Sequence, residues 1–177
     1  TKMDKKAYNR KVGAKRSQRN GKLFETLIER ACTYYSRKGI AQIQKTPEPF
    51  QILRKTRNGQ ATGFYTKMAQ PDFQGTLNGG QSIVFEAKHT EAKLFPFDRI
   101  SSEQQLELEK HHNRGAKCFV ILSFKFKNFY LIDWATWKDM KENIGKKSVN
   151  EKDLQKRNVT QPELISGRLE FLKEAEL

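Results

Sequence analysis

The sequence predicts one α/β domain built around a mixed central sheet that is flanked by helices. Its 177 residues are enough for a single domain with a hydrophobic core. Helix-like and strand-like segments alternate along the chain, as is typical of an α/β protein. The run CFVIL at residues 118–122 is apolar at every position, which indicates a central strand covered on both faces.

The charge of the chain predicts a polyanionic partner. The chain has 34 Lys and Arg residues against 20 Asp and Glu, a net charge of +14. Cations placed along a phosphate backbone release condensed counterions, and no basic segment here also has a strongly apolar face, so nucleic acid is favoured over a membrane. Nothing resembles a secretory signal or a membrane span, and we expect a cytoplasmic protein. Cys32 and Cys118 are expected to be buried free thiols, because neither has a metal-ligand neighbour in sequence.

The chain begins with a strongly basic segment. Its first 20 residues contain eight Lys or Arg and one acidic residue, with almost no apolar periodicity. We expect a flexible N-terminal arm at residues 1–19 and a folded domain at residues 20–177. Such an arm is either a solvated terminus or a segment that orders on phosphates, and the arm alone leaves both open. Its candidate DNA-binding residues are Lys11, Lys15, Arg16 and Arg19.

A helix and a strand are expected next. From about residue 20 apolar side chains recur at helical spacing, and Gly39 is a suitable C-terminal stop. Residues 40–45 alternate like a strand, and the prolines of TPEP at 46–49 end it because proline cannot donate to a sheet ladder.

Residues 50–67 predict a hairpin. Two strand-like runs meet at Asn58-Gly59, which is a strong turn signal. Basic residues crowd the tip, so we expect a DNA-contacting element, although a hairpin without function has the same pattern. The candidate DNA-binding residues are Arg54, Lys55, Arg57 and Lys67. Further along, the pattern indicates a helix at about 101–114, strands at 117–124 and 128–133, and a helix at 134–144.

Acidic residues interrupt this basic chain in DFQGTLNGGQSIVFEAK, residues 72–88. Strand alternation puts Glu86 and Lys88 on one face. If residues 78–80 form a three-residue loop, the register sets Asp72 opposite Glu86, with Cβ atoms about 5 Å apart. Two carboxylates would then meet beside a lysine.

Two close carboxylates repel each other unless a cation lies between them. Mg²⁺ is the natural candidate, because it is held by one or two carboxylates while water and substrate phosphate complete its shell. Such an ion can polarise a phosphate, and Lys88 can neutralise the charge that develops during cleavage. From spacing alone a solvated, salt-bridged strand face explains the pattern equally well.

The residues around this pattern resemble a known family. QPDFQG and FEAK resemble the two halves of the motif of PD-(D/E)xK nucleases. Over about residues 20–155, the following segments resemble, in the same order, the sequence blocks of RecU-type Holliday junction resolvases: GKLFE, YYSRKGIAQIQKTPEPFQI, PDFQG, IVFEAKHT, FPFDRISSEQ and GKKSV.

The resemblance implies a restriction-endonuclease-like fold with a protruding β-hairpin stalk at about residues 50–67. It implies a homodimer that binds four-way DNA junctions and makes paired symmetric nicks with Mg²⁺ or Mn²⁺, with recombination proteins as possible partners. Asp72 and Glu86 would be metal ligands and Lys88 the catalytic lysine. Gln104 would support the site, and Glu25 would complete the acidic cluster.

Two departures from the family pattern stand out. Gln70-Pro71 precede Asp72 where the family usually has small hydroxyl residues, and the stalk is somewhat shorter. Two other functions stay open: a restriction or repair nuclease that cuts linear duplexes, and a DNA-binding architectural protein without catalytic activity.

Overall fold

The computed structural model describes residues 2–65 and 70–172. Its helices are α1 (Lys2–Arg37), α2 (Ser102–His112), α3 (Trp134–Asn143) and α4 (Glu151–Lys156), with a 3-10 helix η1 (Phe97–Arg99). Its strands are β1 (Ala41–Lys45), β2 (Phe50–Lys55), β3 (Ala61–Tyr65), β4 (Phe73–Leu77), β5 (Ser82–Thr90), β6 (Phe95–Pro96), β7 (Lys117–Phe124), β8 (Asn128–Asp133), β9 (Ser148–Val149), β10 (Glu163–Ile165) and β11 (Arg168–Glu170).

The central sheet is mixed, as predicted, and it has five strands. Its order is β1-β4-β5-β7-β8. Only the β5–β7 pair is parallel, and the other three pairs are antiparallel. The parallel pair needs a crossover connection, which α2 supplies. Strand β7 lies second from the β8 edge and is buried along nearly its whole length, which confirms the prediction for residues 118–122.

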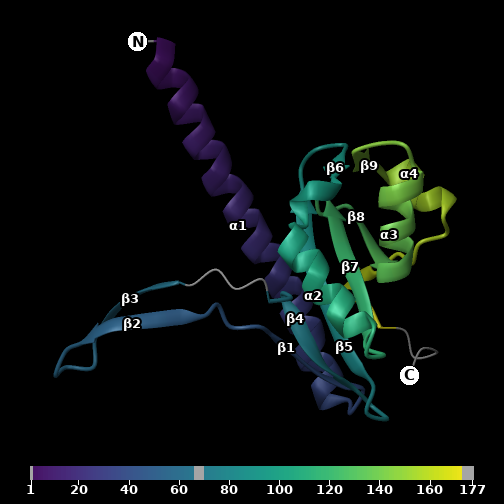
Figure 1. Cartoon of the computed structure of the whole chain (residues 1–177), viewed down its shortest axis with the longest axis horizontal. Coiled ribbons are helices and arrows are strands. Elements are labelled where there is room, and N and C mark those ends of the chain that lie inside the picture. The colour runs from purple at the N-terminus through teal and green to yellow at the C-terminus, as the bar shows by residue number, and fades with distance from the viewer. Residues whose placement is uncertain (1, 66–69, 173–177) are drawn as a thin grey trace.

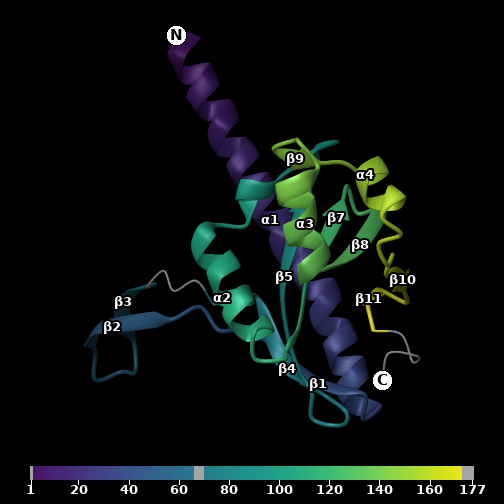
Figure 2. The ribbon, with the colours of Figure 1, turned by 45° about the vertical axis from the view of Figure 1, so that its right-hand side comes forward.

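Helices cover both faces of the sheet (Figures 1 and 2). One core lies between the sheet and α1, and it includes Phe24, Ile28, Ile43, Phe85 and Ile121. The other core lies between the sheet and α2 and α3, and it includes Val84, Leu108, Val120, Trp137 and Met140. Strands β5, β7 and β8 contribute alternate residues to the two cores, so neighbouring side chains face α1 and α2 in turn, whereas β1 and β4 contribute only to the core beneath α1.

The basic segment is helical in the structure. Helix α1 begins at Lys2 rather than near residue 20, so residues 2–19 are helical and continuous with the helix that packs on the core. All side chains from residue 7 to residue 19 are exposed, and Asn20, which follows them, is buried. Lysine, arginine, alanine and glutamine favour helix, and a helix already fixed by packing can be extended one residue at a time. The extension projects away from the rest of the molecule (Figure 1).

Strands β2 and β3 form the hairpin that the sequence pattern predicts, and the hairpin protrudes from the sheet, as the family resemblance implies (Figure 1). Its turn includes Gly59 at φ +79°, where the absence of a Cβ atom removes the steric penalty. The backbone N–H of Thr56 donates to the carbonyl oxygen of Gln60 at 2.9 Å across the turn. The register shifts between Ile52 and Arg54, so Leu53 is a bulge.

Several short elements from residue 95 onward have no counterpart in the predictions. They are the β6–β9 pair, helix α4 and the β10–β11 hairpin. Tyr35 of α1 binds the chain that follows β11. Its hydroxyl accepts hydrogen bonds from the backbone N–H groups of Phe171 and Leu172 at 2.7 and 3.0 Å. Cys32 and Cys118 are buried free thiols, as predicted. Within the described residues, no helix has the length and apolar character of a membrane-spanning segment.

Candidate active site

Asp72 lies at the start of the β4–β5 hairpin, in the register expected from the sequence. The backbone N–H of Leu77 donates to Gln81 at 2.8 Å, and Phe73 pairs with Phe85. The same register sets Asp72 opposite Glu86. Asp72 Oδ2 also accepts a 2.9 Å hydrogen bond from the backbone N–H of Ala87 on β5. The Asp72 carboxylate is therefore held against the strand that contains the second acid.

Glu86 is buried completely, with 0% of its side chain exposed. Strand β5 lies between β4 and β7 and is covered by helices, so Glu86 does not lie on a solvated strand face. Burial is the main cause that raises the pKa of Glu86, to about 8, and the neighbouring charge of Asp72 raises it further, while Lys88 opposes the shift. A buried carboxylate with a raised pKa, beside charged partners, is a typical feature of a functional site.

Lys88 joins the two carboxylates. Its Nζ lies 2.8 Å from Glu86 Oε2 and 3.3 Å from Asp72 Oδ2. Burial by itself lowers the pKa of the Lys88 ammonium, but the charges of Asp72 and Glu86 outweigh it, so the pKa lies above its ordinary value. The side chains of Lys88 and Asp72 are 18% and 22% exposed. The site therefore opens to solvent on the side of Asp72 and Lys88 and is closed behind Glu86.

Gln104 reaches the site from α2. Its Nε2 donates to Glu86 Oε2 at 2.9 Å. Its Oε1 accepts from the backbone N–H of Ser101 at 3.1 Å, and Ser101 Oγ accepts from the backbone N–H of Gln104 at 3.2 Å. This capping box fixes the amide of Gln104. The capping box formed by the sequence SSEQ at the start of α2 thus orients the Gln104 side chain, which contacts the buried Glu86.

The arrangement fits a divalent cation. Lys88 and Gln104 both contact Oε2 of Glu86, whereas Oε1 is buried and has no hydrogen-bond partner among the described residues. A buried carboxylate oxygen is costly to leave unpaired, and hard oxygen donors suit Mg²⁺ or Mn²⁺. No group of three His, Cys, Asp or Glu side chains within residues 2–65 and 70–172 is placed to hold a metal. The chain would therefore supply two carboxylates, Asp72 and Glu86.

Glu25 does not join these two acids in the structure. It lies on α1, where its carboxylate forms a 2.5 Å ion pair with Lys45 of β1. Lys45 pairs with Phe73 in the sheet, and both side chains lie on the face that packs against α1. Asp72 and Glu86 lie on the opposite face, which α2 covers. The expected acidic cluster of three is therefore not formed. The hydrogen bond to Glu25 is the main cause that raises the pKa of Lys45.

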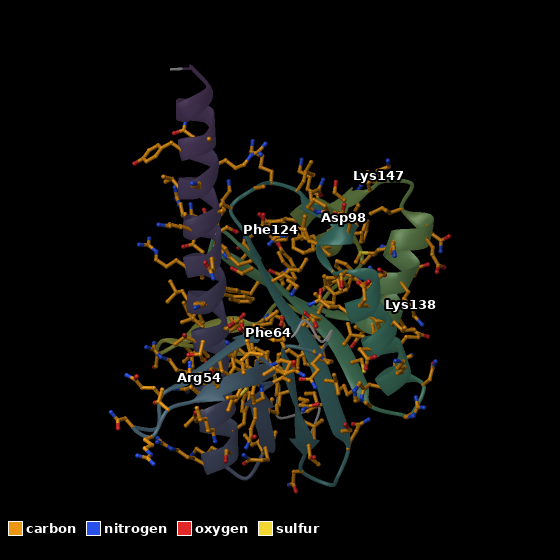
Figure 3. The ribbon with its side chains drawn as sticks, turned by 60° about the vertical axis from the view of Figure 1, so that its left-hand side comes forward. Arg54, Phe64, Asp98, Phe124, Lys138 and Lys147 are labelled. Atoms are coloured by element: carbon orange, nitrogen blue, oxygen red, sulfur yellow. The ribbon has the colours of Figure 1, made fainter. Side chains whose placement is uncertain are left out.

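The candidate DNA-binding residues occupy two projecting elements. The exposed part of α1 contains Lys11, Lys15, Arg16 and Arg19, and the hairpin contains Arg54, Lys55 and Arg57, all of them exposed. Arg54 and Phe64 are labelled on the hairpin in Figure 3. Lys67 lies outside the described residues.

A third basic surface was not predicted. A pocket of about 600 Å³ lies between the start of α2 and the segment after α3. Three lysines line it, and so does Asp98; Lys147 and Asp98 are labelled in Figure 3. Lys141 donates to Gln105 at 2.6 Å and Lys146 pairs with Asp153 at 2.9 Å, while no ion pair of Lys147 occurs among the described residues. In the sequence, this surface corresponds to the Lys-Lys pair in GKKSV. The charge pattern alone did not distinguish these two lysines from the many others in the chain.

Comparisons with known proteins give one family. The model of the family described as RecU, Recombination protein U, matches residues 19–176. The protein named Holliday junction resolvase RecU of Geobacillus kaustophilus (strain HTA426) is 30% identical over 162 residues, which cover 86% of this chain and 80% of that protein. The protein of the same name from Staphylococcus epidermidis (strain ATCC 12228 / FDA PCI 1200) is 29% identical over 164 residues, or 86% of this chain and 78% of that protein.

Among solved structures, the chain is similar to Archaeoglobus fulgidus Hjc, a Holliday junction resolvase from an archaeal hyperthermophile. The TM-score is 0.44 at 16% sequence identity, and the match covers 72% of this chain and 88% of that chain.

Proposed function

The chain belongs to the RecU family of recombination proteins, and from this premise we propose that it is a metal-dependent endonuclease that resolves four-way DNA junctions. The relatives described above are named Holliday junction resolvase RecU. One observation is the main support: Glu86 is fully buried beside Asp72 and Lys88, and one of its carboxylate oxygens has no partner in the part of the chain that the structure describes. A basic protein of net charge +14 that is built only to bind DNA gains nothing from burying an acid at this cost.

Asp72 and Glu86 would hold Mg²⁺ or Mn²⁺, which would supply Lewis-acid polarisation of the scissile phosphate and a nucleophile at neutral pH. Lys88, whose ammonium already lies between the carboxylates, would donate to the phosphate oxygen on which negative charge develops. Gln104 would fix the Glu86 carboxylate through its amide. The buried position of Glu86 keeps bulk water away from one side of the site.

The DNA would contact the three basic elements around this site. These are the exposed part of α1, the β2–β3 hairpin and the pocket that Lys147 lines. Phosphate contacts of this kind position a duplex without reading its sequence, as a structure-selective enzyme requires. The hairpin also exposes Phe50, Ile52, Leu53 and Phe64, apolar side chains that suit contact with bases at the centre of a junction.

Paired nicks in a junction require two active sites. A C2 homodimer supplies them, because a four-way junction has approximate two-fold symmetry. We therefore include a homodimer in the proposal, together with contacts to recombination proteins and action in the cytoplasm, as expected from the sequence.

The deciding experiment is cleavage of a four-way junction with and without Mg²⁺, mapped at nucleotide resolution. We expect symmetric nicks that require the metal, and we expect Asp72→Asn and Glu86→Gln to bind the junction without cutting it. A linear duplex of the same sequence is the control substrate. Equal cleavage of the duplex would indicate a restriction or repair nuclease, and no cleavage in any metal would indicate an architectural protein. Normal cleavage by both variants would refute the site.

A further inference from the structure

Thr46 lies beside Asp72, in a position that the sequence patterns did not single out. It follows β1 directly, and its backbone N–H donates to the carbonyl oxygen of Asp72 at 2.9 Å. The register of β1 and β4 pairs Lys45 with Phe73, so its continuation sets Thr46 opposite Asp72. Opposed residues of an antiparallel pair share a face.

This register extends across a third strand. The β4–β5 pairing sets Asp72 opposite Glu86, as described above. Thr46, Asp72 and Glu86 therefore form one row across the sheet, on the face that α2 covers. Glu25 and Lys45 lie on the other face, so the third oxygen side chain of this row is the hydroxyl of Thr46 and not a carboxylate of α1.

The hydroxyl of Thr46 is buried and has no hydrogen-bond partner within residues 2–65 and 70–172. Among the described residues, three buried side-chain polar atoms lack a hydrogen bond: Thr46 Oγ1, Glu86 Oε1 and Trp137 Nε1. Trp137 lies in the apolar core between the sheet and α3, where the rings of Phe95 and Phe97 contact it. The other two atoms belong to one row, on either side of Asp72. A buried polar atom without a partner destabilises a fold. Two such oxygens, one on each side of Asp72, indicate a place where a further group binds.

We propose that Thr46 is a positioning residue of the metal site, and that its Oγ1 hydrogen-bonds a water molecule in the hydration shell of the ion held by Asp72 and Glu86. The inference rests on the proposed function, because that function supplies the ion. Mg²⁺ bound through one or two carboxylates keeps several waters, and a neutral hydroxyl orients such a water without adding charge. The row then offers two charged oxygen ligands and one neutral partner to the hydration shell.

The test compares Thr46→Val, which keeps the shape and removes the hydroxyl, with Thr46→Ser, which keeps the hydroxyl. The protein is used without DNA, and Mn²⁺ binding is followed by electron paramagnetic resonance. Thermal unfolding is measured in chelator and in Mg²⁺. We expect Thr46→Val to bind Mn²⁺ about tenfold more weakly, and its metal-free Tm to equal or exceed that of the parent protein. Thr46→Ser should bind Mn²⁺ with nearly the parent affinity.

Parent affinity of Thr46→Val for Mn²⁺ would overturn the inference. A lower metal-free Tm of Thr46→Val would also overturn it, since the hydroxyl would then have a structural partner. Asp72→Asn is the reference variant that distinguishes failure of the Thr46 inference from failure of the proposed function. If Asp72→Asn loses Mn²⁺ and Thr46→Val does not, only the role of Thr46 fails. If the parent protein binds no Mn²⁺, the metal site and the proposed function fail together.

Discussion

Gln104 on α2 donates a 2.9 Å hydrogen bond to Glu86 on β5, and the same amide closes the capping box of its helix through its Oε1 atom. One side chain therefore connects the start of α2 to the buried acid. Lys88 donates to the same oxygen of Glu86, so Oε2 has two donors while Oε1 has none among the residues that the structure describes. The carboxylate is held in one orientation, with its free oxygen available to a cation.

Replacement of Gln104 separates its two roles. Gln104→Glu keeps an oxygen that accepts from Ser101, so the capping box is retained. It loses the donor to Glu86 and places another acid there, so we expect junction cleavage to fall about 10- to 100-fold. Gln104→Ala loses both roles and should also lower the free energy of unfolding by about 1 kcal/mol. Parent cleavage rates for Gln104→Glu would show that the amide donor is not required.

Glu86 gives the metal-free protein a pH-dependent stability. Its pKa rises from 4.5 to about 8 on folding, first because of burial, so the protonated form is favoured in the folded state. The contribution of protonated Glu86 to the stability of the folded state is fully present below about pH 4.5 and is lost as the pH rises through about 8. In chelator, the Tm of the parent protein should therefore fall relative to that of Glu86→Gln across this range. A constant difference between the two Tm values would contradict the burial of an ionisable group here.

Tyr35 fastens the last described residues to α1. Its buried hydroxyl accepts from two backbone N–H groups, and burial raises its pKa to about 12. Tyr35→Phe would leave both N–H groups without an acceptor, and we expect the free energy of unfolding in urea to fall by about 1–3 kcal/mol. Tyr34→Phe is the control. Its ring stacks under Arg168 and would remain, so the expected change is within about 0.5 kcal/mol. Equal stability of the two variants would show that the Tyr35 hydroxyl is not needed.

Much of the sheet could be predicted because its signals are local. The loop at residues 78–80 fixes the offset of β4 against β5, and strand alternation then sets Asp72 opposite Glu86. The burial of Glu86 could not be predicted in this way, because it depends on the parallel pairing of β5 with β7 across an intervening helix. The raised pKa of Glu86 follows from that non-local contact.

Dependence on non-local contacts also explains other differences between the sequence predictions and the structure. Lys45 takes Glu25 as its partner because the parity of β1 directs it to α1, and no spacing in the sequence states which helix covers which face. The role of Thr46 depends on two strand registers at once. The helical extension of α1 has the opposite cause: its composition suggested disorder, whereas its residue propensities and the packed helix after Asn20 favour helix.

Lys147 tests whether the pocket beside α2 contacts the DNA. Its side chain is exposed, lines the pocket and has no ion pair among the described residues, so its removal changes one charge and little packing. If it contacts a phosphate, Lys147→Ala should weaken junction binding and reduce the slope of log affinity against log salt by about 1.

Lys38→Ala is the matched control for this prediction. Lys38 is also exposed, but it follows α1 directly, and this end of α1 lies at the opposite end of the domain from β9, which Lys147 precedes (Figure 1). Both variants lower the net charge by the same amount, so a general field effect would reduce binding equally in the two. A larger loss for Lys147→Ala, with an unchanged cleavage rate at saturating protein, is expected from a local phosphate contact. Equal losses would exclude the pocket from the DNA interface.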